Sequence, residues 1–196
     1  MDRETLKKIG EFIKENRMQL TNKELLILAE DIDDFLREEK EPECYFTDNL
    51  LLYINGEDLF ESFTEYIETK INLSGKKVLD IACGRHCLSA AELTAKGAIV
   101  TAMDPYAKPA YNNGFSVRVE NFEGWTSLTE IDLVTAVRAG DCLVEIIMAS
   151  LRDKKKFAIL LPKGNKVEKV RSLCRFSGVK VEILSLSIPY IIVTNL

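Results

Sequence analysis

The feature that most limits the folds open to this chain is a regular alternation of short apolar runs with helix-like stretches, from about Lys76 to the C-terminus. The helical patterns cover residues 88–96, 142–151 and 167–176. The apolar runs predict strands at residues 78–82, 99–103, 117–122, 132–137, 157–161, 179–184 and 190–195. Strands that alternate with helices form a mostly parallel sheet covered on both faces. The sequence therefore predicts an α/β, Rossmann-like domain over residues 73–196.

The last two predicted strands form an exception to this alternation. Only residues 185–189 separate them, whereas a parallel crossover needs about a dozen residues or more. These two strands are therefore predicted to form an antiparallel hairpin at the edge of the sheet.

Residues 1–72 predict a helical N-terminal extension. Leu6, Ile9 and Ile13 recur at helical spacing, and residues 21–24 (Thr-Asn-Lys-Glu) fit a capping box at the start of a second helix. A third helical pattern follows Gly56, with these apolar residues in register: Leu59, Phe63 and Ile67. The apolar stripes are expected to contact the rest of the chain, or to form a lid or a homodimer surface.

The charge of the chain is uneven. Residues 1–72 hold 9 Lys or Arg against 19 Asp or Glu, whereas residues 73–196 hold 17 against 12. The acidic part either docks on the basic part or faces solvent, and this interpretation is favoured. Alternatively, the basic part meets a phosphate-bearing partner such as RNA or DNA.

The cysteines and the chain start indicate a reducing, cytoplasmic location. Five cysteines are scattered through apolar segments, as expected for reduced thiols rather than a disulfide framework. The start is charged, and no apolar run is long enough to span a bilayer, so no membrane association is expected.

Two acidic residues mark the ends of the first two predicted strands. The first strand and its loop read V-L-D-I-A-C-G over residues 78–84, and the second strand leads into M-D-P-Y over residues 103–106. Ligands of doubly wound sheets bind at such carboxyl ends. Gly84 lets the backbone approach a ligand, and the helix expected from about Cys87 directs N–H groups toward an anion. Together, Asp80, Gly84 and Asp104 predict a ligand site at these strand ends.

This pattern resembles the class I S-adenosylmethionine (SAM)-dependent methyltransferases, whose first strand carries V-L-D-x-G-x-G-x-G and whose second strand ends in an acid about two dozen residues later. The resemblance covers about the last 125 residues and implies SAM as cofactor. It implies that Asp104 accepts the ribose hydroxyls and that Asp80 holds the loop or faces the cationic end of the cofactor. The remaining cofactor-binding residues that it implies are Ala82, Cys83, Gly84, Pro105, Asn121, Phe122 and Thr135.

The sequence departs from this family at several points. Ala82 replaces the first glycine of the loop and His86 the third, and the connection from Asp104 to Phe115 leaves little room for a helix. No Asn-Pro-Pro-Tyr or Asp-Pro-Pro-Tyr motif follows the fourth strand, so amino methylation of adenine or cytosine gains no support. Arg138 and Asp141 stand there instead, and either face the substrate or cap the next helix.

These observations leave two functional hypotheses. The first is a SAM-dependent methyltransferase of unidentified acceptor, for which no catalytic residue is assigned. The second is a non-catalytic protein of the same fold that acts as a binding partner or scaffold. A nicotinamide-dinucleotide site is disfavoured because G-x-G-x-x-G is absent. A metal site at Cys83, His86 and Cys87 is not expected, because no second ligand pair accompanies them.

Overall fold

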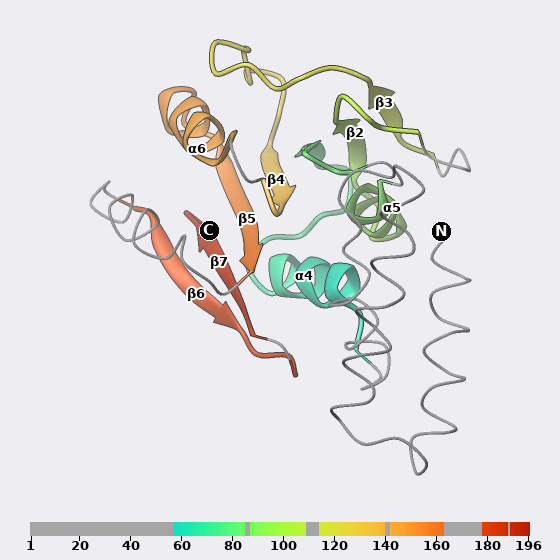
Figure 1. The fold of residues 1–196 in the computed structure, drawn as a ribbon, viewed down its shortest axis with the longest axis vertical. Helices are drawn as coiled ribbons and strands as arrows, with labels where there is room; N and C mark the ends of the chain where they lie inside the picture. The colour runs from blue at the N-terminus through green and yellow to red at the C-terminus, as the bar shows by residue number, and fades with distance from the viewer. Residues whose placement is uncertain (1–56, 85–86, 109–113, 140–141, 163–177, 188) are drawn as a thin grey trace, which may run out of the picture. The chain divides into compact units, whose positions relative to one another are not determined.

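The computed structural model describes residues 57–84, 87–108, 114–139, 142–162, 178–187 and 189–196 (Figure 1). Its elements, in chain order, are α4 (Leu59–Glu68), β1 (Lys77–Ile81), α5 (Leu88–Ala95), β2 (Ile99–Met103), β3 (Ser116–Arg118), β4 (Leu133–Val137), α6 (Leu143–Arg152), β5 (Lys156–Pro162), β6 (Lys180–Leu184) and β7 (Tyr190–Thr194). The helices predicted in the first 56 residues and at residues 167–176 lie outside the described residues. From Phe60 on, the described elements belong to one compact unit, Phe60–Ser185 with Pro189–Leu196. The boundary between residues 72 and 73 stays a prediction.

The sheet has seven strands in the order β3-β2-β1-β4-β5-β7-β6. The first five of these are parallel to one another, and β7 is antiparallel to both β5 and β6. The α/β Rossmann-like fold and its antiparallel edge hairpin, both predicted from the sequence, are confirmed. The strand order reverses between β1 and β4, because the chain runs outward from β1 through β2 and β3 and then returns to the other side of β1. Such a reversal is where doubly wound sheets bind ligands.

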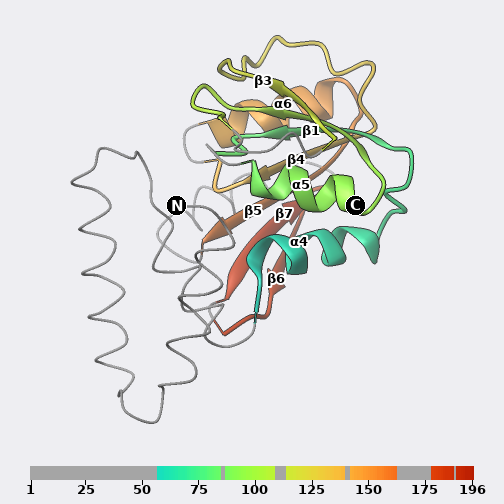
Figure 2. The same cartoon turned by 90° about the vertical axis from the view of Figure 1, so that its right-hand side faces the viewer.

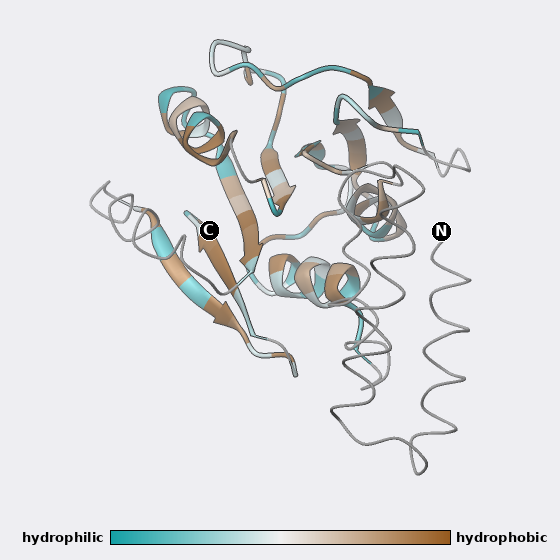
Figure 3. Cartoon of the chain, viewed as in Figure 1, coloured by the Kyte–Doolittle hydropathy of each residue, from teal (hydrophilic) through white to brown (hydrophobic). Residues whose placement is uncertain are grey.

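The two strands of the hairpin differ in burial. All five residues of β7 are buried, whereas every residue of β6 is exposed or half-buried. Figure 3 shows the same contrast, with hydrophilic residues interrupting β6 but not β7. The more apolar strand therefore takes the position between two neighbours, and the charged strand forms the edge.

Helices cover both faces of the sheet, with α6 on one face and α4 and α5 on the other (Figure 2). On the α6 face, alternate residues of β1, β4, β5 and β7 pack with Leu143, Ile146 and Ile147 in one apolar core. On the other face, α4 buries Phe63 and Ile67 completely. Glu68, the last residue of α4, pairs with Lys96 after α5, and Lys70, two residues beyond the helix, pairs with Glu182 on β6.

Strand β3 is shorter than the sequence predicts. The expected strand covers residues 117–122, but the observed one ends at Arg118. The reason is its partner: Arg118 pairs with Met103, and β2 ends there before the chain turns at Asp104. Without a neighbouring strand, the chain beyond Arg118 has no ladder to continue.

The connection from β3 to β4, residues 119–132, contains no helix. Two cationic residues, Arg152 at the end of α6 and Lys155 just beyond it, hold this connection in place. Arg152 donates from its guanidinium to the carbonyl oxygens of Gly124 and Thr126, each at 2.8 Å, and Lys155 donates to that of Thr129 at 2.7 Å. Among the described residues, no helix is both long enough and apolar enough to cross a membrane.

Candidate functional site

The loop that joins β1 to α5 has an unusual backbone. Ala82, Gly84 and Cys87 all adopt the left-handed conformation, with φ of 53°, 70° and 52°. An L-residue pays about 1 kcal/mol or more for this conformation, whereas glycine adopts it freely. Ala82 therefore adopts a backbone conformation that favours glycine, and this conformation costs it free energy. Strained residues of this kind cluster at functional sites.

The loop leaves open space above Gly84. A Cβ built on this glycine would meet no atom within 4 Å. Glycine is therefore favoured here because of its backbone conformation and not because a side chain would meet a neighbouring atom. The same open space lets a ligand approach the loop backbone closely.

Asp104 connects the ends of β1 and β2. Its Oδ2 accepts a hydrogen bond from the Gly84 N–H at 3.1 Å, and its Oδ1 accepts one from the Tyr106 N–H at 2.8 Å. Each carboxylate oxygen has two lone pairs, so both oxygens keep the capacity to accept a further hydrogen bond. The side chain is half-buried, between the buried Met103 and the exposed Pro105. A carboxylate that can accept from ligand hydroxyls thus lies beside the loop.

Asp80 lies beneath the loop and is completely buried. Its Oδ2 accepts from the Ser89 hydroxyl of α5 at 2.5 Å, and its Oδ1 accepts from the Thr135 hydroxyl of β4 at 2.8 Å. Burial raises the pKa of Asp80 to about 6; the two hydroxyls oppose this shift, and the negative charge of Asp104 adds to it. The carboxyl group of Asp80 therefore joins β1, α5 and β4 from inside the protein.

Helix α5 begins directly after the loop. Its N-cap residue, Cys87, makes no side-chain cap, although its N–H donates to the Gly84 carbonyl oxygen at 3.4 Å. The first N–H groups of a helix lack intrahelical partners and carry the positive end of the helix dipole. The start of α5 thus adds anion-binding character next to Gly84 and Asp104.

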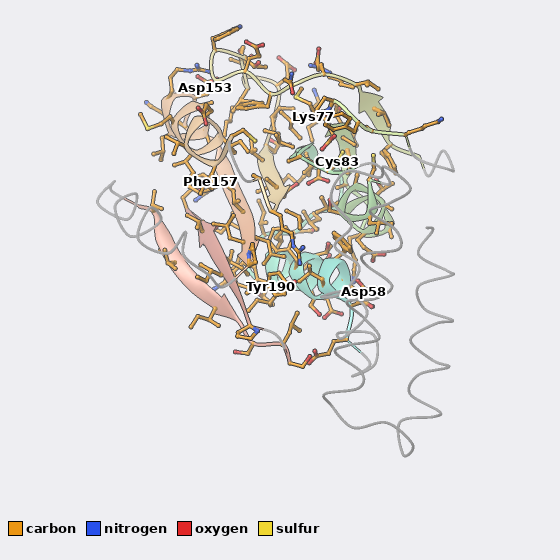
Figure 4. The ribbon with its side chains drawn as sticks, in the orientation of Figure 1. Asp58, Lys77, Cys83, Asp153, Phe157 and Tyr190 are labelled. Atoms are coloured by element: carbon orange, nitrogen blue, oxygen red, sulfur yellow. The ribbon has the colours of Figure 1, made fainter. Side chains whose placement is uncertain are left out.

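The structure groups some of the sequence-predicted residues and separates others. Asp80, Ala82, Cys83, Gly84, Asp104 and Pro105 lie at the adjoining ends of β1 and β2 (Cys83 is labelled in Figure 4). Thr135 is fully buried, and its hydroxyl donates to Asp80 beneath the loop. Beyond the end of β3, Asn121 is exposed and Phe122 packs against the apolar core on the α6 face. Binding of a cofactor by each of these residues stays a prediction.

Arg138 occupies the carboxyl end of β4, next to β1. Its φ of 58° is left-handed, and its Nη2 donates to the hydroxyl of Tyr190 at 2.7 Å. Tyr190 is fully buried at the start of β7, beside Pro162 at the end of β5 (Figure 4). One partner of Arg138 is thus a tyrosine of the edge hairpin. Asp141, which the sequence analysis named with Arg138, lies outside the described residues.

Sequence reasoning missed two residues of this region, Ser89 and Tyr190. Ser89 stands in the first turn of α5 and carried a weak signal, because it is a small polar residue on a helix that faces the sheet. Tyr190 carried none, because its contact with Arg138 depends on β7 lying next to β5. That position follows from strand pairing and not from any local pattern.

No protein-family model matches this sequence, and no curated protein matches it. Among solved structures, it is similar to a magnesium protoporphyrin IX methyltransferase from Synechocystis with bound SAM, at 15% identity and a TM-score of 0.52, over 87% of this chain and 94% of that one. It is also similar to a TehB-like SAM-dependent methyltransferase from Corynebacterium glutamicum, at 17% identity and a TM-score of 0.48, over 86% and 97% of the two chains. At such identities, the first likeness supports the fold alone.

Proposed function

We propose that this chain, which has the Rossmann-like fold of class I SAM-dependent methyltransferases, binds SAM and transfers its methyl group to an acceptor. The observation that carries the proposal is the hydrogen bond between the Gly84 N–H and the Asp104 carboxylate. It brings together the glycine turn, the acidic end of β2 and the start of α5 beside the point where the strand order reverses. This combination suits a ligand with vicinal hydroxyls and a carboxylate, as SAM has.

Different residues of the chain would contact the ribose, the adenine and the methionine part of the cofactor. Asp104 would accept the ribose hydroxyls with the lone pairs that its two backbone donors leave, and Pro105, Asn121 and Phe122 would border the adenine. The left-handed loop of Ala82, Cys83 and Gly84, with the first N–H groups of α5, would hold the methionine part. Asp80 and Thr135 would support the loop from below.

The chemistry that SAM supplies is an electrophilic methyl group. The chain's part in such a transfer is to hold the methyl donor and the acceptor in line, which lowers the entropic part of the barrier. A positioned nucleophile does not always need a dedicated base. We therefore assign no catalytic residue, and the absence of an assigned base does not count against activity.

The acceptor, the assembly and the location belong to the same proposal. The excess of basic residues in 73–196 makes RNA and DNA worth including among the acceptors tested. A homodimer through the predicted helices of residues 1–72 would be detected by sedimentation. The cytoplasm is the expected location.

The second candidate function is that of a non-catalytic protein of this fold. It is favoured by the strained Ala82 in place of a loop glycine and by the lack of a helix between β3 and β4. Such a protein would bind SAM weakly or not at all and would act as a partner or scaffold. Cofactor binding separates the two candidates.

Calorimetric titration with S-adenosylhomocysteine and SAM tests the proposal, with NADH as the negative control. Micromolar binding is expected, and Asp104→Ala should weaken it about ten- to a hundredfold, because charge-assisted hydrogen bonds contribute about 1.5–3 kcal/mol. Glu130→Gln is the matched control, since this carboxylate is mostly exposed and pairs with Lys77 at the amino end of β1. Folded protein that binds neither ligand at millimolar concentration would contradict the proposal and favour the second candidate.

A further inference from the structure

Two cysteines flank the glycine turn of the loop between β1 and α5. Cys83 and Cys87 have their Sγ atoms 3.5 Å apart, and both Sγ atoms lie 3.6 Å from the carbonyl oxygen of Gly84. Cys83 is 7% exposed and Cys87 is fully buried. Both thiols are reduced, as is Cys142, which donates to the carbonyl oxygen of Ala139. The loop proposed to bind SAM thus holds two thiols in contact.

We infer that Cys83 and Cys87 are an oxidisable thiol pair, whose disulfide would fix the loop and weaken cofactor binding. The regulatory half of this inference rests on the proposed function; the formation of the disulfide does not. A disulfide requires an S–S distance of about 2.05 Å, so the two sulfur atoms must approach by roughly 1.5 Å. Cys83 lies in the loop after β1 and Cys87 is the N-cap of α5; we expect rotation of these two short side chains to supply a movement of that size.

The oxidant is a peroxide. One thiol attacks a peroxide oxygen, which gives a sulfenic acid and releases the first water molecule. The second thiol then attacks that sulfur, which forms the S–S bond and releases the second water molecule. In sum, two S–H bonds break, one S–S bond forms, and the two electrons lost by sulfur reduce one hydrogen peroxide molecule to two molecules of water.

The environment of Cys83 controls the rate of this reaction. The hydrogen bond with Cys87, burial, and the nearby carboxylates of Asp80 and Asp104 all raise the pKa of the Cys83 thiol. The thiolate is the reactive form, so oxidation is expected to be slow at neutral pH and faster at alkaline pH. The pair would therefore respond to sustained oxidant rather than to brief exposure.

Oxidation should affect binding through Gly84. This residue follows Cys83 directly, and its N–H donates to Asp104. A covalent bond between Cys83 and Cys87 would hold the Gly84 turn between two linked ends, so the loop could no longer adjust to a ligand. We expect affinity for S-adenosylhomocysteine to fall about tenfold and to recover on reduction with dithiothreitol.

Peptide mapping after peroxide treatment reads the bond directly, because Arg85 lies between the two cysteines in the sequence. Trypsin then yields residues 78–85 and 86–96 as separate peptides after reduction, but as one linked pair after oxidation. Titration of the reduced, oxidised and re-reduced protein with S-adenosylhomocysteine follows, with circular dichroism to show that each form is folded. Cys142→Ser is the matched control and should respond to peroxide like the wild type. Cys87→Ser should yield no linked peptides, and its affinity for S-adenosylhomocysteine should be the same before and after peroxide treatment.

The outcomes separate the two proposals. Linked peptides with a reversible drop in affinity support the inference. An absence of linked peptides after prolonged oxidation at alkaline pH overturns it, even if the variants fail to fold, because mapping uses the wild-type chain. Linked peptides with unchanged affinity overturn the regulatory half. Reduced protein that binds no S-adenosylhomocysteine contradicts the proposed function, while mapping still decides whether the disulfide forms.

Discussion

The most unusual single residue in the described chain is Asp80, a carboxyl group with no exposure to water whose described partners are two hydroxyls. Neither Ser89 nor Thr135 carries a charge that could offset ionisation. Burial therefore prevails over the hydroxyls and holds the pKa of Asp80 at about 6, against 3.8 for the same group in water. Ionisation of this residue must cost stability.

Asp80→Asn should remove that cost. In the unfolded chain the carboxyl group ionises near pH 3.8 and in the folded chain near pH 6, so the folded state binds more protons between these values and stability falls as pH rises. The free energy of unfolding of the wild type, relative to the variant, should decrease by about 2 kcal/mol between pH 4 and pH 7. Urea unfolding of both proteins across this range measures the difference.

Ser89→Ala provides the control for this pH dependence. The Ser89 hydroxyl opposes the upward shift of the Asp80 pKa, so its loss should extend the decrease in stability to higher pH. A difference between the wild type and Asp80→Asn that stays constant from pH 4 to pH 7 would contradict this account of Asp80.

At the scale of single residues, the sequence predicted which residues meet at the ends of β1 and β2, but not the Ser89 hydroxyl that contacts Asp80 from α5. The spacing of Asp80, Gly84 and Asp104 was sufficient to place them at adjoining strand ends. The strained conformation of Ala82 could not be predicted, because backbone angles depend on how the loop closes onto Asp104. The hydroxyl of Ser89 could not be assigned to Asp80 without the packing of α5.

At the scale of elements, the loop between β1 and α5 depends on one glycine conformation. Gly84→Ala should lower the free energy of unfolding by about 1 kcal/mol, because φ is +70° there, although the added Cβ meets no neighbouring atom. Gly124→Ala is the matched control: its φ is not in the left-handed region, and its Cβ would make an ordinary contact with Glu145 at 3.6 Å. Urea unfolding should show that variant to be neutral or slightly stabilised, and equal stabilities for the two variants would contradict the role of backbone strain.

The strands illustrate which elements can be predicted from sequence. Strands β1, β2, β4 and β5 were predicted to within one residue at either end, because a run of residues buried on both faces has few competing interpretations. Strand β3 was overestimated at its end, because its length is set by where β2 stops. The local sequence indicates where an edge strand begins. Where it ends depends on the length of the neighbouring strand with which it pairs.

At the scale of the whole molecule, the order of the two hairpin strands determines which hairpin residue contacts the end of β4. The sequence predicted an antiparallel hairpin at the sheet edge, and the structure places β7 rather than β6 next to β5. This arrangement brings Tyr190 to Arg138 at the carboxyl end of β4. The apolar sequence of β7 is the physical reason for its interior position, but the contact itself emerges only when seven strands are assembled.

Helix α4 also acts at the scale of the whole molecule. The sequence groups its residues with the N-terminal extension, whereas from Phe60 on they belong to the compact α/β unit. Ile67 of this helix is fully buried, Glu68 at its end pairs with Lys96 after α5, and Lys70 just beyond the helix pairs with Glu182 on β6. We therefore expect α4 to stabilise the sheet and not only the segment before it.

Ile67→Ala should lower the free energy of unfolding of the α/β unit by about 2–5 kcal/mol, the usual cost of removing a fully buried isoleucine side chain. Glu65→Ala, an exposed position on the same helix, should change it by no more than about 0.5 kcal/mol. The rate of amide hydrogen exchange in β1 and β4 reports the stability of the sheet itself. This exchange rate should rise in Ile67→Ala. The opposite outcome is that β1 and β4 exchange at the wild-type rate while only α4 loses protection. In that case α4 would unfold independently of the sheet, and the boundary predicted after residue 72 would gain support.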